Sequence, residues 1–105
     1  MARLELTLHT KDGEETYKQE HVSGQKYLDL LNMDIEFNEK LGIMTRVEQI
    51  EKQLDYIAGL FDNTKVTAQY ILEGTDSWDV EPMIDRIMGI VLGVDSGDEK
   101  KEQSL

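Results

Sequence analysis

The residues best suited to metal binding or acid–base catalysis are two histidines near the N-terminus, His9 and His21. On neighbouring strands of a hairpin, they could meet as metal ligands or as a general-base pair. No cysteine or close pair of carboxylates completes a tetrahedral ligand set around them. Both strands are expected to have solvated outer faces, so we predict no metal site and no bound cofactor.

A second group has the spacing of a calcium-binding loop. Asp34, Glu36 and Asn38 alternate as such a loop does at its start. Glu39 occupies the position where the loop needs glycine, and Thr45 occupies the position of its closing glutamate. We therefore interpret this segment as a polar connection.

Two aspartates, Asp76 and Asp79, could act as a carboxylate pair. Aspartate also accepts hydrogen bonds from exposed N–H groups at turns and helix starts, and we favour that interpretation. No serine or lysine has a recognisable nucleophile context, and the eight glycines form neither a phosphate-binding loop nor a dinucleotide fingerprint. The sequence therefore predicts a protein that is not an enzyme.

Length and charge limit the class of partner. The 105 residues suffice for one modest core, and 22 acidic against 11 basic residues give a formal net charge of −11. Such a field repels phosphate backbones and anionic membrane surfaces, so we expect no nucleic-acid or membrane partner. The sequence has no cysteine, no signal peptide and no apolar run of the ~20 residues that cross a bilayer. These features favour a cytosolic protein.

The secondary structure that must position these side chains is predicted by the spacing of the apolar residues, which changes from alternation near the N-terminus to helical spacing later in the chain. Leu4, Leu6 and Leu8 alternate with polar residues, which predicts a strand over 4–10. The pair Asp12-Gly13 favours a tight turn, and a second strand over 16–22 would complete a hairpin over about 3–22. That strand is polar on both faces and should form an exposed edge.

Helical spacing begins after the hairpin, and it predicts an α+β domain over residues 1–93 with three to four helices. A capping box is formed by Thr45 and Glu48, and Thr67 and Asp79 are further cap candidates beside Ser23. The polar segment 94–105 is expected to be a disordered acidic tail. The expected helices cover residues 24–34, 45–61, 67–73 and 79–92.

Burial is predicted from the same spacing. The first helix should bury Tyr27, Leu28 and Leu31, and its burial could extend to Ile35. The second helix should form the centre of the core. Its apolar face comprises Val47, Ile50, Leu54, Ile57, Ala58 and Phe61.

The last helix has more apolar residues than one buried stripe needs. Either the hairpin and the second helix sandwich it, or part of its surface meets a partner. Trp78 either forms a hydrophobic staple with Met83 around the cap or is an exposed anchor. Methionine suits adaptable binding surfaces. The candidate partner-binding residues are Trp78, Met83, Met88, Ile90 and Leu92.

The order and spacing of several segments resemble the small tail assembly chaperones of long-tailed, siphovirus-type bacteriophages. The resemblance covers about residues 1–93 and depends on the joint order of its landmarks. These landmarks are Val22–Gly24, Tyr27, Leu28, Leu30, Leu31, Leu60–Asn63, Val66, Thr67, Tyr70–Gly74 and Pro82–Gly93.

The resemblance implies a non-catalytic chaperone that binds the tape measure protein and keeps it soluble before the tail tube polymerises. It implies a location in the host bacterial cytoplasm and absence from the mature virion. A frameshifted long form could reach the tail tube protein, and Lys100 and Lys101 could be encoded by a slippery adenine run. Self-association is a further expectation.

A second function remains open at this point. An acidic protein could mimic DNA and inhibit a host nucleic-acid-binding protein. Mimicry predicts ordered rows of carboxylates, whereas here acids and bases alternate along the second helix and much of the excess charge lies near turns and in the tail. Binding by mimicry should weaken steeply with salt, whereas apolar binding should tolerate it.

Overall fold

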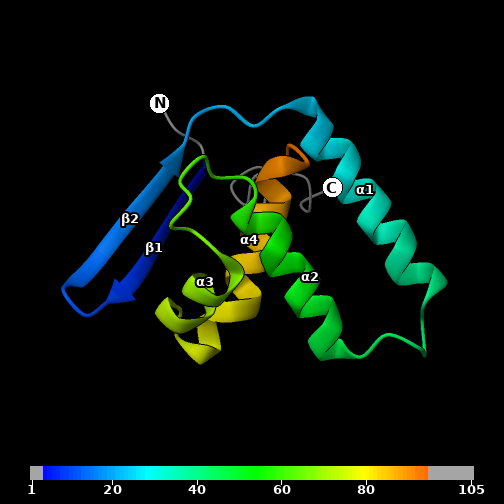
Figure 1. Cartoon of the computed structure of the whole chain (residues 1–105). Helices are drawn as coiled ribbons and strands as arrows, with labels where there is room; N and C mark the ends of the chain where they lie inside the picture. Colours follow the sequence, from blue (N-terminus) through cyan, green and yellow to red (C-terminus); the bar gives the residue numbers. More distant parts are fainter. Residues whose placement is uncertain (1–3, 95–105) are drawn as a thin grey trace, which may run out of the picture.

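The structure, a computed structural model, describes residues 4–94. A two-stranded antiparallel hairpin, β1 (Leu4–Thr10) and β2 (Gly13–Gln19), precedes the helices. In Figure 1 the hairpin and α1 lie on opposite flanks, with α2, α3 and α4 between them. The predicted α+β class is confirmed. The helices are α1 (Gly24–Glu39), α2 (Arg46–Ala58), α3 (Ala68–Gly74), the short 3-10 helix η1 (Ser77–Asp79) and α4 (Val80–Val91).

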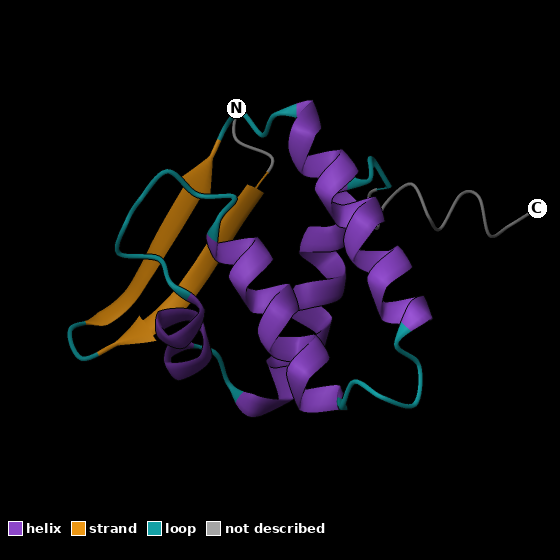
Figure 2. Ribbon diagram, turned by 45° about the vertical axis from the view of Figure 1, so that its right-hand side comes forward, coloured by secondary structure: helices purple, strands orange, loops and turns teal. Residues whose placement is uncertain are grey.

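The hairpin turn is tighter than the sequence indicated. Thr10 pairs directly with Gly13, so only Lys11 and Asp12 form the turn. The positive φ falls on Gly13 alone, at +109°. Pairing therefore starts at once, and the second strand covers Gly13–Gln19 instead of the predicted 16–22. The ribbon view of Figure 2 shows the two strands as one twisted ladder beside the helices.

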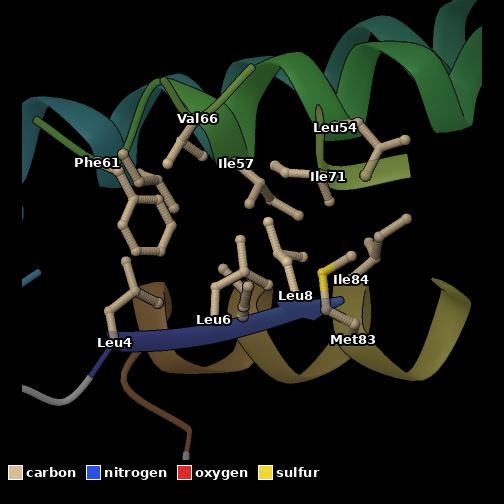
Figure 3. Close-up of a cluster of buried hydrophobic side chains, with 12 residues drawn as sticks. Leu4, Leu6, Leu8, Leu54, Ile57, Phe61, Val66, Ile71, Met83 and Ile84 are labelled. Atoms are coloured by element: carbon tan, nitrogen blue, oxygen red, sulfur yellow. The ribbon is translucent and has the colours of Figure 1, made fainter. Parts of the chain in front are cut away.

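The core lies between one face of this hairpin and the helices. The three alternating leucines of β1 are all buried, as the period-2 pattern predicts. Figure 3 shows them pointing toward apolar side chains of α2, α3 and α4 and of the 59–67 connection. The buried cluster comprises Leu4, Leu6, Leu8, Leu54, Ile57, Leu60, Phe61, Val66, Ile71, Met83, Ile84 and Ile87.

Helix starts follow the predicted capping in part. The capping box is confirmed, with Glu48 N donating to Thr45 Oγ1 at 3.1 Å and Thr45 N donating to Glu48 Oε1 at 2.8 Å. Thr67 Oγ1 accepts from Tyr70 N at 3.1 Å at the start of α3. Ser23 and Asp79 occupy N-cap positions, but their side chains make no capping hydrogen bond. A 3-10 turn already ends at Asp79, and it leads the chain directly into α4.

The first helix is longer than predicted. Residues 35–39, which we expected to lie beyond the first helix in a polar connection or a frayed continuation, continue α1 as far as Glu39. Glu36 stabilises this last part because Lys40 Nζ lies 3.0 Å and Lys52 Nζ 3.8 Å from its carboxylate. The chain then turns at Gly42, where φ is +83°. The opposite end of the chain is described as far as Val94, so residues 95–105 of the expected tail over 94–105 lie outside the described residues.

Candidate interaction surface

The two histidines do not form a site together. His9 lies in β1, with Nδ1 3.6 Å from Glu14 and Nε2 3.6 Å from Asp76, whereas His21 follows the end of β2. Among residues 4–94, no group of three or more His, Cys, Asp or Glu side chains could hold a metal ion. No helix in this part of the chain is long and apolar enough to cross a membrane.

One polar cluster connects the hairpin to α3. The hydroxyls of Tyr17 and Tyr70 lie 2.9 Å apart, and Tyr17 also donates to Glu15 Oε1 at 2.5 Å. Hydrogen bonds from Tyr17 first, then from Tyr70, together with the charge of Lys65, lower the pKa of the Glu15 carboxyl. The bond to Glu15 is the largest cause that raises the pKa of Tyr17. Because every member has a partner inside the cluster, we interpret it as a structural link.

The five residues predicted to bind a partner do not gather in one patch. Met83 is 7% exposed and belongs to the core, because it lies on the face of α4 that meets β1. Trp78, which is 75% exposed in η1, therefore forms no buried staple with it. Met88 and Ile90 are half-buried against the core, and Leu92 is exposed. Trp78 and Leu92 also flank opposite ends of α4, whose 12 residues span about 18 Å.

The larger apolar surface lies on α1. Tyr27, Leu31 and Ile35 are spaced four residues apart, and Leu28 falls on the same side of the helix. All four side chains are exposed, so the prediction that α1 buries Tyr27, Leu28 and Leu31 is wrong. We call these four residues the α1 stripe.

α1 has a second apolar face, which holds it on the domain. Leu30 is buried, and Met33 and Phe37 on the same side are half-buried. Tyr56 Oη of α2 donates to the backbone oxygen of Lys26 at 2.5 Å. Burial, with a smaller effect from the charge of Asp29, raises the pKa of Tyr56 to about 12. The inner face of α1 therefore packs against the domain, and the side chains on its outer face are exposed.

The attachment of α1 is shallow. An open groove of about 480 Å³ lies between α1 and α2, and most of the residues that line it are polar or charged. The groove is lined by Asp29, Asn32, Met33, Glu36, Lys52, Asp55 and Tyr56. In Figure 1, α1 is on the flank remote from the hairpin, so no sheet covers it on that side.

Exposed apolar side chains continue beyond α1. Leu41 and Ile43 in the connection to α2 are largely exposed, as is Val47 in its first turn. At the other end of α1, a pocket of about 310 Å³ is lined by Tyr27, Ile90 and Val91 among others. Ile90, one of the predicted binding residues, thus lies beside the start of the α1 stripe.

The family model described as phage tail chaperone protein matches residues 1–105. The chain belongs to this family. Comparison with curated proteins and with solved structures finds no match. A chaperone family implies a non-catalytic role for this tail chaperone.

In this phage tail chaperone, sequence reasoning missed the surface that α1 presents. Ile35, Leu41 and Ile43 were not among the predicted partner-binding residues, and Tyr27, Leu28 and Leu31 were assigned to the core. One signal was present: residues 27–37 place apolar side chains on two opposite sides of one helix. A helix at the margin of a small domain can bury only one of two such sides.

Proposed function

We propose that this chaperone binds apolar helical segments of the tape measure protein on the α1 stripe and keeps that protein soluble before the tail tube polymerises. The family assignment supports the chaperone role, and the uncovered α1 stripe supports the place of binding. The tape measure protein is a long helical chain with apolar segments that would aggregate if left exposed. The encounter takes place in the host cytoplasm, and the chaperone leaves before the virion is complete.

The α1 stripe suits a helix as its client. Leu28, Leu31 and Ile35 follow the i, i+3 and i+7 spacing by which one amphipathic helix packs against another, and Tyr27 lies one turn before Leu31. Burial of apolar surface stabilises the complex by ~25 cal/mol per Å², and no nucleotide is needed. Tube subunits that cover the same client surface release the chaperone by competition. The net charge of −11 keeps the loaded complex in solution.

The test is co-expression with the tape measure protein encoded in the neighbouring reading frames. Leu31→Asp on the α1 stripe should abolish co-purification and return the tape measure protein to the insoluble fraction, because a carboxylate cannot be buried against an apolar client. Leu72→Asp is the matched control. Leu72 is a leucine of nearly equal exposure, 37% against 38%, but it lies on α3. Equal loss in both variants would contradict the assignment to α1.

Salt concentration separates this function from DNA mimicry. Apolar binding of the client should survive moderate salt, whereas binding of a basic nucleic-acid-binding protein should weaken steeply. A tape measure protein whose solubility is independent of the chaperone would overturn the proposal and favour the acidic inhibitor.

A further inference from the structure

The two edges of the hairpin differ in their contacts with the rest of the chain. Along β1, Arg86 Nη2 of α4 donates to Glu5 O at 3.1 Å. A Cβ added at Gly74 of α3 would lie 3.1 Å from His9 O, so the helix backbone closely approaches that part of the strand. Along β2, no described residue donates to or accepts from the outward backbone groups. In Figure 1, β2 forms the outer margin of the molecule.

The Arg86 contact also shows which groups of β2 point outward. Arg86 approaches from outside the sheet, so Glu5 O points away from β2. In an antiparallel pair, opposite residues either bond to each other or both turn their backbone groups outward, in alternation. Glu5 is opposite Lys18, so Lys18 points its N–H and C=O outward. By alternation, Thr16 and Glu14 do the same.

We propose that two copies of this chain pair through β2, antiparallel and centred on Thr16, to form a four-stranded sheet. Thr16 is the midpoint of Gly13–Gln19, so this register pairs the strand over its whole length. All three outward residues, Glu14, Thr16 and Lys18, then exchange both backbone hydrogen bonds with the second copy.

The charges along β2 favour a second copy of the chain as the partner, and they favour the register centred on Thr16. Lys18 of each copy falls opposite Glu14 of the other, and opposite charges on facing residues stabilise a sheet. Within one chain, Lys18 Nζ already lies 4.0 Å from Glu5 and His9 Nδ1 lies 3.6 Å from Glu14. Each outer row of the joined sheet therefore reads Glu5, Lys18, Glu14, His9, with signs that alternate when His9 is protonated.

The central row is also self-complementary. The hydroxyls of Thr7 and Thr16 are 2.9 Å apart in one chain, and the two-fold axis would extend this row to four threonines.

The two neighbouring registers would place like charges opposite each other. A centre on Glu15 sets two Glu15 carboxylates opposite each other, and a centre on Tyr17 sets Glu14 opposite Glu20.

Space beside the strand is available for a second copy. An open groove of about 660 Å³ lies between the segments 16–19 and 61–64. Because the second strand runs antiparallel, its own 61–64 segment lies at the other end of the joined sheet, so the two connections do not meet. The pairing alone buries less than a standard interface, so we expect a weak dimer.

The first test is sedimentation equilibrium from about 1 μM to about 1 mM, where weak dimers populate. Thr16→Pro removes the central N–H at an edge position that tolerates proline, and should weaken dimerisation by about tenfold or more. Thr16→Val is the matched control, because it also loses the hydroxyl but keeps the N–H. In the wild type, exchange of the Thr16 amide hydrogen should slow as concentration rises. A wild type that stays monomeric throughout overturns the proposal.

The sharper test exchanges charges and is independent of the folding of the proline variant. Glu14→Lys places Lys opposite Lys18, and Lys18→Glu places Glu opposite Glu14, so each variant alone should remain monomeric. Mixed one to one, they form only opposite-charge pairs and should dimerise with each other.

Each remaining outcome is also decisive. Failure of the mixture to restore pairing contradicts the register. Dimerisation that persists in Thr16→Pro but disappears in Leu31→Asp would place the contact on the α1 stripe and overturn the β2 assignment. Since these experiments contain no tape measure protein, their result does not depend on the proposed client.

Discussion

Leu54 in α2 and Leu31 in α1 occupy equivalent positions, each on the apolar stripe of an amphipathic helix. Leu54 is completely buried, because α2 packs against both α3 and α4. Leu31 remains exposed, because α1 is the outermost helix and its other face already meets the domain. Equal spacing therefore leads to unequal burial, and the difference is set by how many neighbours a helix has.

This difference in burial also suggests different roles for the two regions. Residues that meet both the hairpin and a second helix carry the stability of the fold. The α1 stripe is exposed, so we expect it to contribute little to that stability, and it is the surface on which we propose that the client binds. Substitutions in the core should consequently lower the free energy of unfolding, whereas substitutions in the α1 stripe should leave it almost unchanged.

The largest effect is expected in the core. Ile57→Ala removes a side chain with no exposed surface and should lower the free energy of unfolding by about 2–5 kcal/mol. Leu31→Ala should change it by no more than about 0.5 kcal/mol. Urea denaturation followed by circular dichroism measures both. Equal losses would mean that the α1 stripe is part of the core in solution.

The close approach of α3 to β1 gives the next effect. A Cβ at Gly74 would lie 2.8 Å from Leu8 Cβ, so Gly74→Val should cost about 1–3 kcal/mol through overpacking. Gly24, at the start of α1, has open space around its Cα. Gly24→Ala should therefore leave thermal stability unchanged or slightly raise it. A harmless Gly74→Val would show that α3 and β1 are further apart than described.

A smaller and local effect is expected at the attachment of α1. Tyr56→Phe removes the hydrogen bond to Lys26 O and should cost about 1 kcal/mol. Hydrogen exchange should accelerate in α1 while α2 and β1 keep their protection, because α1 opens by itself. Uniform acceleration over the whole chain would contradict the division into two regions.

The smallest effect concerns acid. The folded state lowers the pKa of Glu15 from 4.5, so this group stabilises the fold above pH 4.5, and the contribution is lost as pH falls through the folded pKa. Tyr17→Phe removes the largest cause and should raise that pKa toward 4.5. Tyr70→Phe should raise it less. Carbon-13 titration of the Glu15 carboxyl measures both, and an unchanged midpoint in Tyr17→Phe would refute the link.

Local signals predicted the fold well where they act within a few residues. The alternation of the β1 leucines and the Thr45–Glu48 capping box are each recognised from a few consecutive residues, and both are confirmed. The extent of α1 was not predictable in this way. Its last part carries the local Glu36–Lys40 pair, but it is also held by Lys52 of α2, a contact that local spacing does not show.

The candidate surface was less predictable than the fold. An excess of apolar residues in the last helix was correctly noticed, but Met83 faces the core. Which side of an apolar helix remains open depends on the arrangement of all the helices. Only the three-dimensional structure shows that α1 lies at the margin.

The partly occupied edge of β1 limits how far this sheet can grow. Arg86 donates to Glu5 O and Gly74 lies against His9, so a third strand could not pair along the whole of β1, whereas the outward backbone groups of β2 have no partner among the described residues. In the language of polymer chemistry, the chain is a monofunctional unit. Once two copies have joined in the proposed dimer, neither has a free β2 edge left. The proposed dimer would therefore have no fully free strand edge from which a cross-β fibre could grow.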